Sequence, residues 1–350
     1  MNILMVGAGG FIGSHLSEKI LRERRDWRIT AVDLHQKNVL HLMKDDNFQF
    51  RQMDILTDLE ELEQLLASCD LLLPLAAIAN PATYVEDPLR VFELDFEANL
   101  RLVKWAVKYR KRIIFPSTSE VYGMCSDTEF SEENSNCITG PIGKQRWIYS
   151  CSKQLLDRVI YAHGKMNGVD YTLFRPFNFI GPRLDNIHDP HYGASRVVSQ
   201  FLSNILHGND IRLVNGGYQQ RCFTDIADGV EAIMKIIENP NNAASGQIFN
   251  IGNPGNLISI KELAQLMLGV ARDYPQLRDQ ASRLKIVETT SMEYYGDGYQ
   301  DVDRRVPAVA KINHLLGWSP STTTEAAIRK IFDEFNGDTG DTGPQNCRGD

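Results

Sequence analysis

Short apolar runs alternate with segments of helical periodicity through the first half of this 350-residue chain. The run at 71–77 is apolar at almost every position, which is typical of a strand that is covered on both faces. Strands that alternate with helices form a parallel sheet, because each helix returns the chain to the same end of the sheet. We therefore predict an α/β fold with a doubly wound parallel sheet, whose strands are residues 2–6, 28–33, 48–53, 71–77, 113–116 and 169–175.

The pattern changes after Phe177, where a loop rich in Pro, Gly and Asn spans 178–191. The last residues, 337–350, contain almost no apolar side chain and are predicted to be disordered. Helices are predicted before the change at 88–109 and 146–163, and after it at 195–207, 225–238, 260–270, 308–316 and 324–335, with short strands at 211–214 and 247–250.

The first strand runs directly into a glycine-rich turn, in the sequence MNILMVGAGGFIGSH. Gly7 lets the chain turn sharply, Gly10 lets the backbone approach a pyrophosphate, and Gly13 lets the next helix pack against the strand. That helix offers N–H groups and the positive end of its dipole to an anion. Asp33 ends the second strand, where a carboxylate binds a ribose 2′-hydroxyl and repels a 2′-phosphate. The pattern predicts a Rossmann domain that binds NAD rather than NADP.

The length of the chain suits a nucleotide-binding domain with a smaller partner. We predict that residues 1–177 form the NAD-binding domain and that 221–251 return to it. Residues 178–220 and 252–336 are predicted to form mainly the substrate domain. The long polar segment at 117–145 lies in the first domain, and loops of that length usually serve a site.

Composition narrows the possible functions. The net charge is -8, so the protein has no general attraction for nucleic acid or for an anionic membrane surface. No apolar run reaches the length of a membrane span, and the cysteines show neither CxxC pairs nor metal-ligand spacing. We expect a cytoplasmic protein with reduced thiols and no metal. Because the chain begins with the first strand of the fold, we expect no cleaved signal peptide.

The strongest chemical signal is the pair Tyr149 and Lys153, in YSCSK. Four positions apart on a helix, the two side chains lie on one face. A lysine ammonium favours the phenolate, so we expect it to lower the pKa of Tyr149 and to make the phenol a general base near neutral pH. Thr118, directly after the strand at 113–116, adds the hydroxyl that such a site requires.

Several motifs resemble the extended short-chain dehydrogenase/reductases that act on nucleotide sugars: the glycine turn, STSEVYG (117–123), YxxxK and RPFNFIGPR (175–183). The likeness runs from residue 2 to about 335. Longer runs are similar to UDP-glucuronic acid dehydrogenase/decarboxylases of the ArnA type, known from polymyxin resistance: PLAAIANP, DPLRVFELDF, YRKRIIFPSTSEVYGMCSD, RWIYSCSKQLLDRVI, RCFTDI and YYGDGYQDVDRR. This sequence starts at the dinucleotide fold, so we expect a protein of that type without the formyltransferase half.

The resemblance implies a role for each residue that matches the family's motifs. The implied catalytic residues, for oxidation of UDP-glucuronic acid at C4 and loss of its carboxylate, are Thr118, Ser119, Glu120, Tyr149, Lys153 and Arg305. The implied contacts to NAD are Gly7, Gly10, Phe11, Ile12, Gly13, Asp33, Asp54, Ile55, Tyr149 and Lys153. The implied contacts to the UDP-sugar are Pro81, Tyr84, Asn178, Arg196, Arg212, Arg221 and Tyr299.

The residue type at position 119 distinguishes this chain from the related 4,6-dehydratases. The 4,6-dehydratases of this superfamily carry Asp-Glu where this chain has Ser119 and Glu120, and a serine cannot supply the proton that an eliminated hydroxyl needs. Arg305 is suited to hold the substrate carboxylate. The alternative is that Arg304 and Arg305 are solvated charges that pair with the neighbouring aspartates at the surface.

Two products and several other functions stay open. A decarboxylase of this type releases UDP-4-keto-pentose or, after reduction by the bound NADH, UDP-xylose. The alternatives are a 4-epimerase or 4,6-dehydratase of the same family, or a non-catalytic nucleotide-sensing Rossmann protein.

The helices at 88–109 and 146–163 carry more apolar surface than one sheet face needs, and related enzymes pair these helices. We therefore expect a homodimer, with no nucleic-acid or membrane partner.

Overall fold

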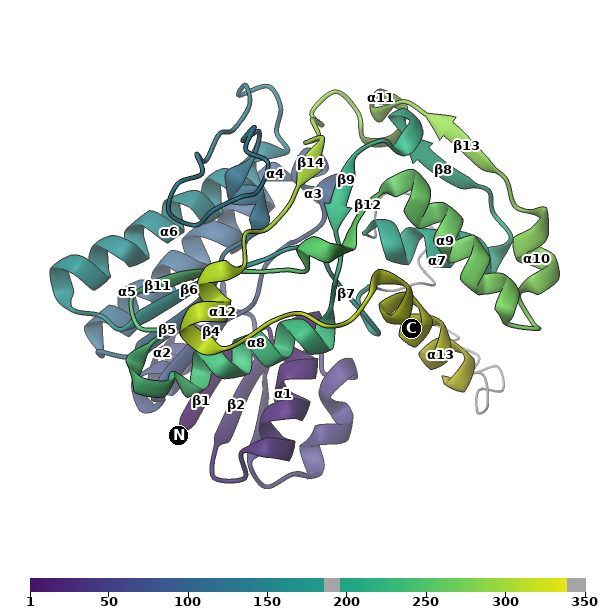
Figure 1. Cartoon of the computed structure of the whole chain (residues 1–350). Helices are drawn as coiled ribbons and strands as arrows, with labels where there is room; N and C mark the ends of the chain where they lie inside the picture. The colour runs from purple at the N-terminus through teal and green to yellow at the C-terminus, as the bar shows by residue number, and fades with distance from the viewer. Residues whose placement is uncertain (186–195, 339–350) are drawn as a thin grey trace.

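A parallel sheet runs through the computed structural model, which describes residues 1–185 and 196–338 (Figure 1). The sheet has seven strands in the order β3-β2-β1-β4-β5-β6-β11, and every neighbouring pair is parallel. The predicted doubly wound α/β fold is confirmed. The strands are β1 (Asn2–Val6), β2 (Arg28–Asp33), β3 (Phe48–Gln52), β4 (Leu71–Pro74), β5 (Arg112–Pro116), β6 (Tyr171–Pro176) and β11 (Gln247–Ile251).

Successive residues of β1 point to opposite faces of the sheet, and both faces are covered. Ile3 and Met5 belong to one apolar cluster, whereas Leu4 and Val6 belong to another. All four side chains are buried, which explains why the strand is apolar throughout. The first cluster includes α1 (Phe11–Glu23) and α8 (Ile226–Glu238), and the second includes α2 (Leu59–Ser68), α5 (Asn99–Lys108) and α6 (Trp147–Asn167).

A smaller lobe lies beside the sheet, at the upper right of Figure 1. Its buried side chains, among them Leu263 and Met267, belong to the same apolar cluster as the α1 face of the sheet. One continuous core therefore joins the lobe to the sheet. The lobe contains α7 (Val197–His207), β8 (Ile211–Val214), α9 (Ile260–Asp273), α10 (Arg278–Arg283), β13 (Ile286–Thr289) and α11 (Ser291–Tyr295).

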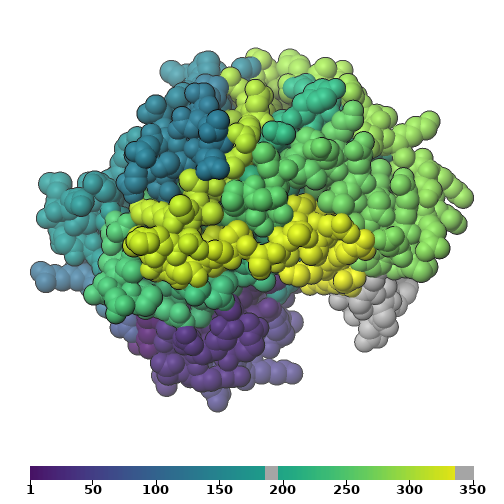
Figure 2. Space-filling view, in the orientation of Figure 1, coloured from purple at the N-terminus to yellow at the C-terminus, as the bar shows by residue number. Residues whose placement is uncertain are grey.

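The C-terminal segment connects the two parts. In Figure 2 its yellow atoms lie across the molecule between the purple N-terminal segment and the green lobe. Helix α12 (Ala310–Leu316) contacts β11 of the sheet, whereas α13 (Thr324–Asp338) packs on α9 of the lobe. Helix α13 enters the segment predicted to be disordered by two residues, so the prediction is wrong there; residues 339–350 lie outside the described part of the chain.

The helix predicted at 88–109 is present from Pro88 to Lys108, but a π-helical turn interrupts its regular hydrogen bonding. The chain forms α4 (Pro88–Phe92), then a π-helical turn, η2 (Glu93–Ala98), and then α5. The buried side chain of Asn99 donates through Nδ2 to the carbonyl oxygen of Leu94 at 3.0 Å. A π-helical turn is a local change of register, and side-chain hydrogen bonds of this kind stabilise it in a way that apolar periodicity does not reveal.

The hydrophobic pattern also does not predict several short elements. Strand β14 consists only of Arg304 and Arg305, too few residues for an alternating pattern. It pairs with β9 so that Arg305 lies opposite Arg221. The other elements in this group are α3 (Pro81–Glu86), η3 (Ser119–Tyr122), β7 (Phe179–Ile180), β9 (Gln220–Cys222), β10 (Thr224–Asp225) and β12 (Leu257–Ser259).

Candidate active site

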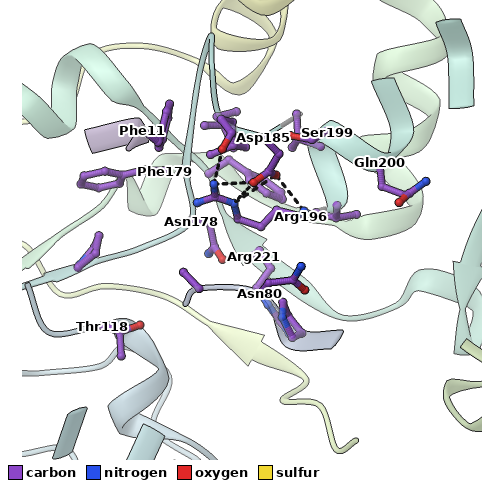
Figure 3. Close-up of a pocket in the computed structure, with 18 of the residues that line it drawn as sticks. Phe11, Asn80, Thr118, Asn178, Phe179, Asp185, Arg196, Ser199, Gln200 and Arg221 are labelled. Atoms are coloured by element: carbon purple, nitrogen blue, oxygen red, sulfur yellow. Dashed lines mark hydrogen bonds and ion pairs between the residues drawn. The ribbon is translucent and has the colours of Figure 1, made fainter. Parts of the chain in front are cut away.

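A cavity of about 1040 Å³ opens between the sheet and the smaller lobe. Its wall brings together the glycine turn, the segment after β5, the start of α6 and β14. Open α/β sheets bind ligands at the carboxyl ends of their strands. The volume is at the top of the usual range for small-molecule sites. Figure 3 shows part of the wall, where Arg196 and Asp185 pair near Phe11 and Phe179.

The glycine turn has the geometry that a dinucleotide needs. Gly7 has a φ of +85°, and a Cβ atom there would lie 2.5 Å from the nitrogen of Ala76. A Cβ atom on Gly13 would lie 2.6 Å from the oxygen of Gly7, so only glycine permits this close packing of helix on turn. Gly10 is the N-cap of α1, and no side chain caps the first N–H groups of that helix. These groups are therefore available to a pyrophosphate.

Asp33 is held at the carboxyl end of β2 by main-chain donors. The N–H groups of Gly9 and His35 donate to its two carboxylate oxygens at 2.8 and 3.0 Å. The fixed carboxylate and the open glycine turn together fit NAD. Asp33, like Asp54 and Ile55, is not among the residues that line the cavity itself, so the contact of each with the cofactor stays a prediction.

The residues predicted for oxidation lie together beyond β5. Thr118 is the N-cap of η3, and its hydroxyl is hydrogen-bonded to that of Tyr149. Lys153 lies one turn further along α6 and donates through Nζ to the oxygen of Pro116 at 3.2 Å. The ring of Tyr149 stacks on that of Tyr84, with centroids 4.7 Å apart and an interplanar angle of 9°. The structure thus gives the Tyr149 ring a fixed position.

The expectation that the pKa of Tyr149 is lowered toward neutral pH is wrong for this arrangement. Burial raises the pKa of Tyr149 above its usual range, the charge of Asp95 raises it further, and the hydrogen bond with Thr118 only partly opposes them. The ammonium of Lys153 lies 5.9 Å from the centroid of the ring, and burial lowers its own pKa. Desolvation therefore outweighs the lysine charge, and a phenolate at neutral pH requires a further positive charge nearby.

A second cluster on the cavity wall contains three buried arginines and two carboxylates. Glu120 lies between Arg146, whose Nη1 is 2.8 Å from Oε2, and Arg305, which donates to Oε1. Arg221 pairs with Asp301, with 2.7 Å between Nη2 and Oδ1. Three guanidinium groups against two carboxylates leave one buried positive charge without a partner.

The guanidinium groups keep both carboxylates ionised. Burial raises the pKa of Glu120, but Arg146 and Arg305 outweigh it and lower this pKa to about 2. Burial likewise raises the pKa of Asp301, and Arg221, Arg146 and Arg305 together lower it below its usual value. Nε of Arg146 and both Nε and Nη2 of Arg305 are buried without a hydrogen bond. Such donors require a partner, and the spare positive charge makes an anion the suitable one.

Adjacent residues Arg304 and Arg305 have different environments. Arg305 is 3% exposed and pairs with Glu120, so the alternative of a surface pair with the neighbouring aspartates is wrong for this residue. Arg304 is exposed and donates to the carbonyl oxygen of Thr128 at 2.7 Å. The pairing of β14 with β9 causes the difference, because it turns Arg305 toward the buried Arg221.

The other residues predicted to contact substrate surround the same cavity. Asn178 has a φ of +40° and donates through Nδ2 to the oxygen of Cys222 at 3.2 Å. The guanidinium of Arg196 pairs with Asp185 at 2.7 Å and lies over the ring of Phe11. Their contacts with substrate remain predictions. The wall also includes Pro81, Tyr84, Arg212, Arg221 and Tyr299.

Sequence reasoning misses Arg146 and Asp301. Arg146 precedes Tyr149 by three positions, and that spacing at the start of a helix is the signal that could have identified it. Its guanidinium lies over the ring of Trp147 and over that of Tyr299, at 4.8 and 5.5 Å from their centroids. Asp301 has no comparable signal, because an aspartate in a polar run is usually solvated.

Metal ligation and membrane insertion have no candidate within residues 1–185 and 196–338. No three His, Cys, Asp or Glu side chains gather there in a way that could hold a metal ion. No helix in these ranges is long and apolar enough to cross a membrane. The cysteines in these ranges carry free thiols, and they are Cys69, Cys125, Cys137, Cys151 and Cys222.

Comparison with known proteins agrees with this geometry. The profile of the NAD dependent epimerase/dehydratase family matches residues 3–252. The PbgP3 protein from Burkholderia pseudomallei is 49% identical over 96% of each chain, with a TM-score of 0.87. UDP-glucuronic acid 4-epimerase from Bacillus cereus, solved with UDP-glucuronic acid and NAD, is 22% identical over 96% of this chain and 99% of its own, with a TM-score of 0.81. UDP-glucose 4-epimerase from Thermotoga maritima, solved with UDP-glucose, is 24% identical over 97% and 100%, with a TM-score of 0.79. At these identities the two epimerases share the fold.

The arginine cluster predicts how Glu120→Gln changes stability. Removing one partner from buried ion pairs leaves guanidinium charge unmatched, so the free energy of unfolding at pH 7 should fall by about 3 kcal/mol. Because the pKa of Glu120 is lowered in the folded protein, its stabilising contribution is complete above the unfolded pKa of 4.5 and is lost as the pH falls toward about 2. Urea unfolding at about pH 7 and about pH 3.5 checks this, and a deficit of equal size at both pH values would contradict it.

Proposed function

This chain belongs to the NAD-dependent epimerase/dehydratase family, and from that premise we propose that it oxidises UDP-glucuronic acid at C4 and then releases the C6 carboxylate as CO2. The observation that carries the proposal is the unpaired positive charge of the arginine cluster beside Tyr149. A sugar carboxylate matches that charge and accepts hydrogen bonds from the free donors of Arg146 and Arg305. A neutral hexose would leave these buried donors without an ionic partner.

The nucleotide part of the substrate is assigned to three cationic residues of the wall, of which Arg221 also belongs to the arginine cluster. Arg196 and Arg212 come from the smaller lobe, and Arg221 comes from β9. Guanidinium groups bind phosphate oxygens in pairs, which suits a UDP pyrophosphate. Asn178, held in a left-handed conformation next to β7, supplies an amide on the same side.

In the proposed oxidation, Tyr149 accepts the proton of the C4 hydroxyl. The hydrogen bond with Thr118 holds the phenol oxygen, and the stack with Tyr84 holds the plane of the ring. When bound, NAD supplies the hydride acceptor and a positively charged ring. Lys153, one turn further along α6, adds its ammonium and so opposes the effect of burial on the phenol.

Decarboxylation follows because oxidation at C4 makes the sugar a β-keto acid. The bond between C5 and C6 breaks, CO2 leaves, and the electron pair enters an enolate that includes C4, its oxygen and C5. A proton must then be delivered to C5. Arg305 is assigned to the carboxylate, and Glu120 orients Arg305 and Arg146 through its two oxygens. Ser119, buried in the wall beside them, is assigned to hold the carboxylate or to deliver the proton.

Other reactions of the family compete with this proposal. A UDP-glucuronic acid 4-epimerase would use the same oxidation and the same carboxylate site, but it would keep the carboxylate. A 4,6-dehydratase is less favoured, because Ser119 stands where that reaction needs an acid. A nucleotide sensor would have no use for the aligned Thr118, Tyr149 and Lys153.

One assay distinguishes these functions. The protein is incubated with NAD and UDP-glucuronic acid, and NMR identifies the sugar products while CO2 is measured. The proposal predicts CO2 with UDP-4-keto-pentose or UDP-xylose. UDP-galacturonic acid without CO2 would identify an epimerase, and an unchanged substrate would support a sensor.

Tyr149→Phe should abolish hydride transfer and leave NAD binding nearly intact. The phenylalanine keeps the stack on Tyr84 but lacks the hydroxyl that accepts the proton. Loss of a general base lowers the rate by about 10²–10⁴-fold. NADH formation at 340 nm measures the step, and a rate close to that of the wild type would rule out the assignment.

Arg305→Met should lower CO2 release by orders of magnitude while NAD affinity and the fold are retained. Methionine fills the space of the side chain but cannot bind the carboxylate. Arg304→Met is the matched control, because Arg304 is exposed and contacts only the loop around Thr128 among the contacts described. If both variants released CO2 at the wild-type rate, the carboxylate would have to be bound elsewhere.

We also propose a homodimer formed through α4, α5 and α6. Leu89 and Leu155 on these helices are 72% and 49% exposed, which leaves apolar surface open to water. Sedimentation at micromolar concentration should show a dimer that Leu155→Arg dissociates. The control is Met292→Arg, a change of similar exposure on the smaller lobe. A wild-type protein that sediments as a monomer would exclude the dimer.

A further inference from the structure

A buried carboxylate next to the oxidation site has no role in the reaction described above. Asp95 has no exposed surface and lies in the π-helical turn η2. We propose that Asp95 is a positioning residue that keeps Lys153 in its ammonium form and in place behind Tyr149. The inference rests on the proposed oxidation, in which Lys153 acts as a cation.

The π-helical turn fixes where Asp95 points. Asn99 donates through Nδ2 to the oxygens of Leu94 and Ala76 at 3.0 and 3.3 Å. Oδ2 of Asp95 accepts the N–H of Ile78 at 3.1 Å. The turn is therefore joined on both sides to the chain that follows β4. Turns of this type are rare, and they occur frequently at functional sites.

The second oxygen of Asp95 is directed at the lysine. Oδ1 is buried without a hydrogen bond and lies 3.9 Å from Nζ of Lys153. Lys153 is 1% exposed, donates to Pro116 and lies over the ring of Phe115. A separation of 3.9 Å is too long for a hydrogen bond, but at that distance two buried charges interact strongly. The pair is thus electrostatic, and its geometry leaves the ammonium free to donate elsewhere.

Among the charged groups described near Lys153, Asp95 is the one suited to keep the lysine in its ammonium form. From α6 itself, Asp157 also faces Lys153, but it is paired with Arg175 of β6 at 3.0 Å and accepts the hydroxyl of Ser117. The remaining groups act on Tyr149: Glu120 raises the pKa of the phenol, and Arg196 lowers it. Tyr84 packs on Tyr149 as a neutral phenol, and its own pKa is raised by burial. Asp95 is therefore the carboxylate near Lys153 that no other cation in these contacts balances.

The direction of each effect follows from burial and charge. Burial lowers the pKa of Lys153, and the charges of Asp95 and Asp157 oppose that effect. Burial raises the pKa of Asp95 to about 7, against the opposing influence of Lys153 and of the Ile78 N–H group. The carboxylate is thus ionised above about pH 7, and there it holds the proton on Lys153. Asp95 also raises the pKa of Tyr149, so its contribution to catalysis acts through the lysine.

The first experiment compares pH profiles of kcat/KM for NADH formation. Asp95→Asn keeps an acceptor for the Ile78 N–H group but removes the charge. Its activity should stay close to that of the wild type below about pH 6, where the natural carboxyl is protonated, and should fall at an alkaline pH about one unit lower than in the wild type. Glu97→Gln, an exposed carboxylate in the same turn, is the control and should keep the wild-type profile. An Asp95→Asn profile with the wild-type alkaline midpoint would overturn the proposal.

A second measurement needs no substrate, so it separates this inference from the proposed function. A carboxyl with a raised folded pKa stabilises the fold fully below its unfolded pKa of 3.8, and this stability is lost as the pH rises through about 7. Compared with the wild type, Asp95→Asn should therefore gain melting temperature between about pH 4.5 and pH 8. A difference in melting temperature that stays constant over that interval would show that the folded protein does not shift the pKa of Asp95, and it would overturn the proposal.

If Asp95→Asn does not fold, Lys153→Met provides the test. Without the ammonium, Asp95 must ionise alone in the interior, so the melting temperature of this variant should fall relative to the wild type as the pH rises from about 6 to 9. A difference that does not change with pH would show that the two charges are not coupled. That result would overturn the proposal even if the protein decarboxylates UDP-glucuronic acid.

Discussion

The cavity depends on one carboxylate that stands between two buried guanidinium groups. Glu120 joins segments that are far apart in the chain: η3 after β5, the start of α6 through Arg146, and β14 through Arg305. Transfer of ions from water to a protein interior is unfavourable, and mutual attraction compensates only when the geometry is good. The rings of Trp147 and Tyr299 both contact Arg146 and so help to maintain that geometry.

A second polar network lies beneath the oxidation site and supports it. Asp157 accepts hydrogen bonds from Ser117 at 2.8 Å and from Arg175 at 3.0 Å. Arg175 also donates to the hydroxyl of Tyr122, which in turn donates to Asn250 on β11. These bonds connect the neighbouring strands β6 and β11, the residue that follows β5, η3 and α6. The segment that carries Thr118 and Glu120 is therefore held from below before any substrate arrives, which is the condition for electrostatic preorganisation.

Buried charge of this kind is accommodated by the apolar core around it. The free energy of unfolding of a domain is only about 5–15 kcal/mol. Several incompletely paired ions near one cavity therefore lower it by a substantial fraction. One apolar cluster extends from the α1 face of the sheet into the smaller lobe, and its side chains are almost all inaccessible to solvent. The lobes are thus joined by packing that does not involve the site, and the polar groups of the site are free to serve binding and chemistry.

The sequence by itself determined the fold class, the glycine turn and the common face of Tyr149 and Lys153. Each depends on spacing within a single strand, turn or helix, and local geometry translates such spacing directly into position. The partner of Arg305, the π-helical turn around Asp95 and the pKa of Tyr149 were decided only by the tertiary structure. Strand β14 is too short for any pattern, and its pairing partner lies far away in the chain. Charge pairing and desolvation depend on every group packed around a side chain, and spacing along the chain does not contain that information.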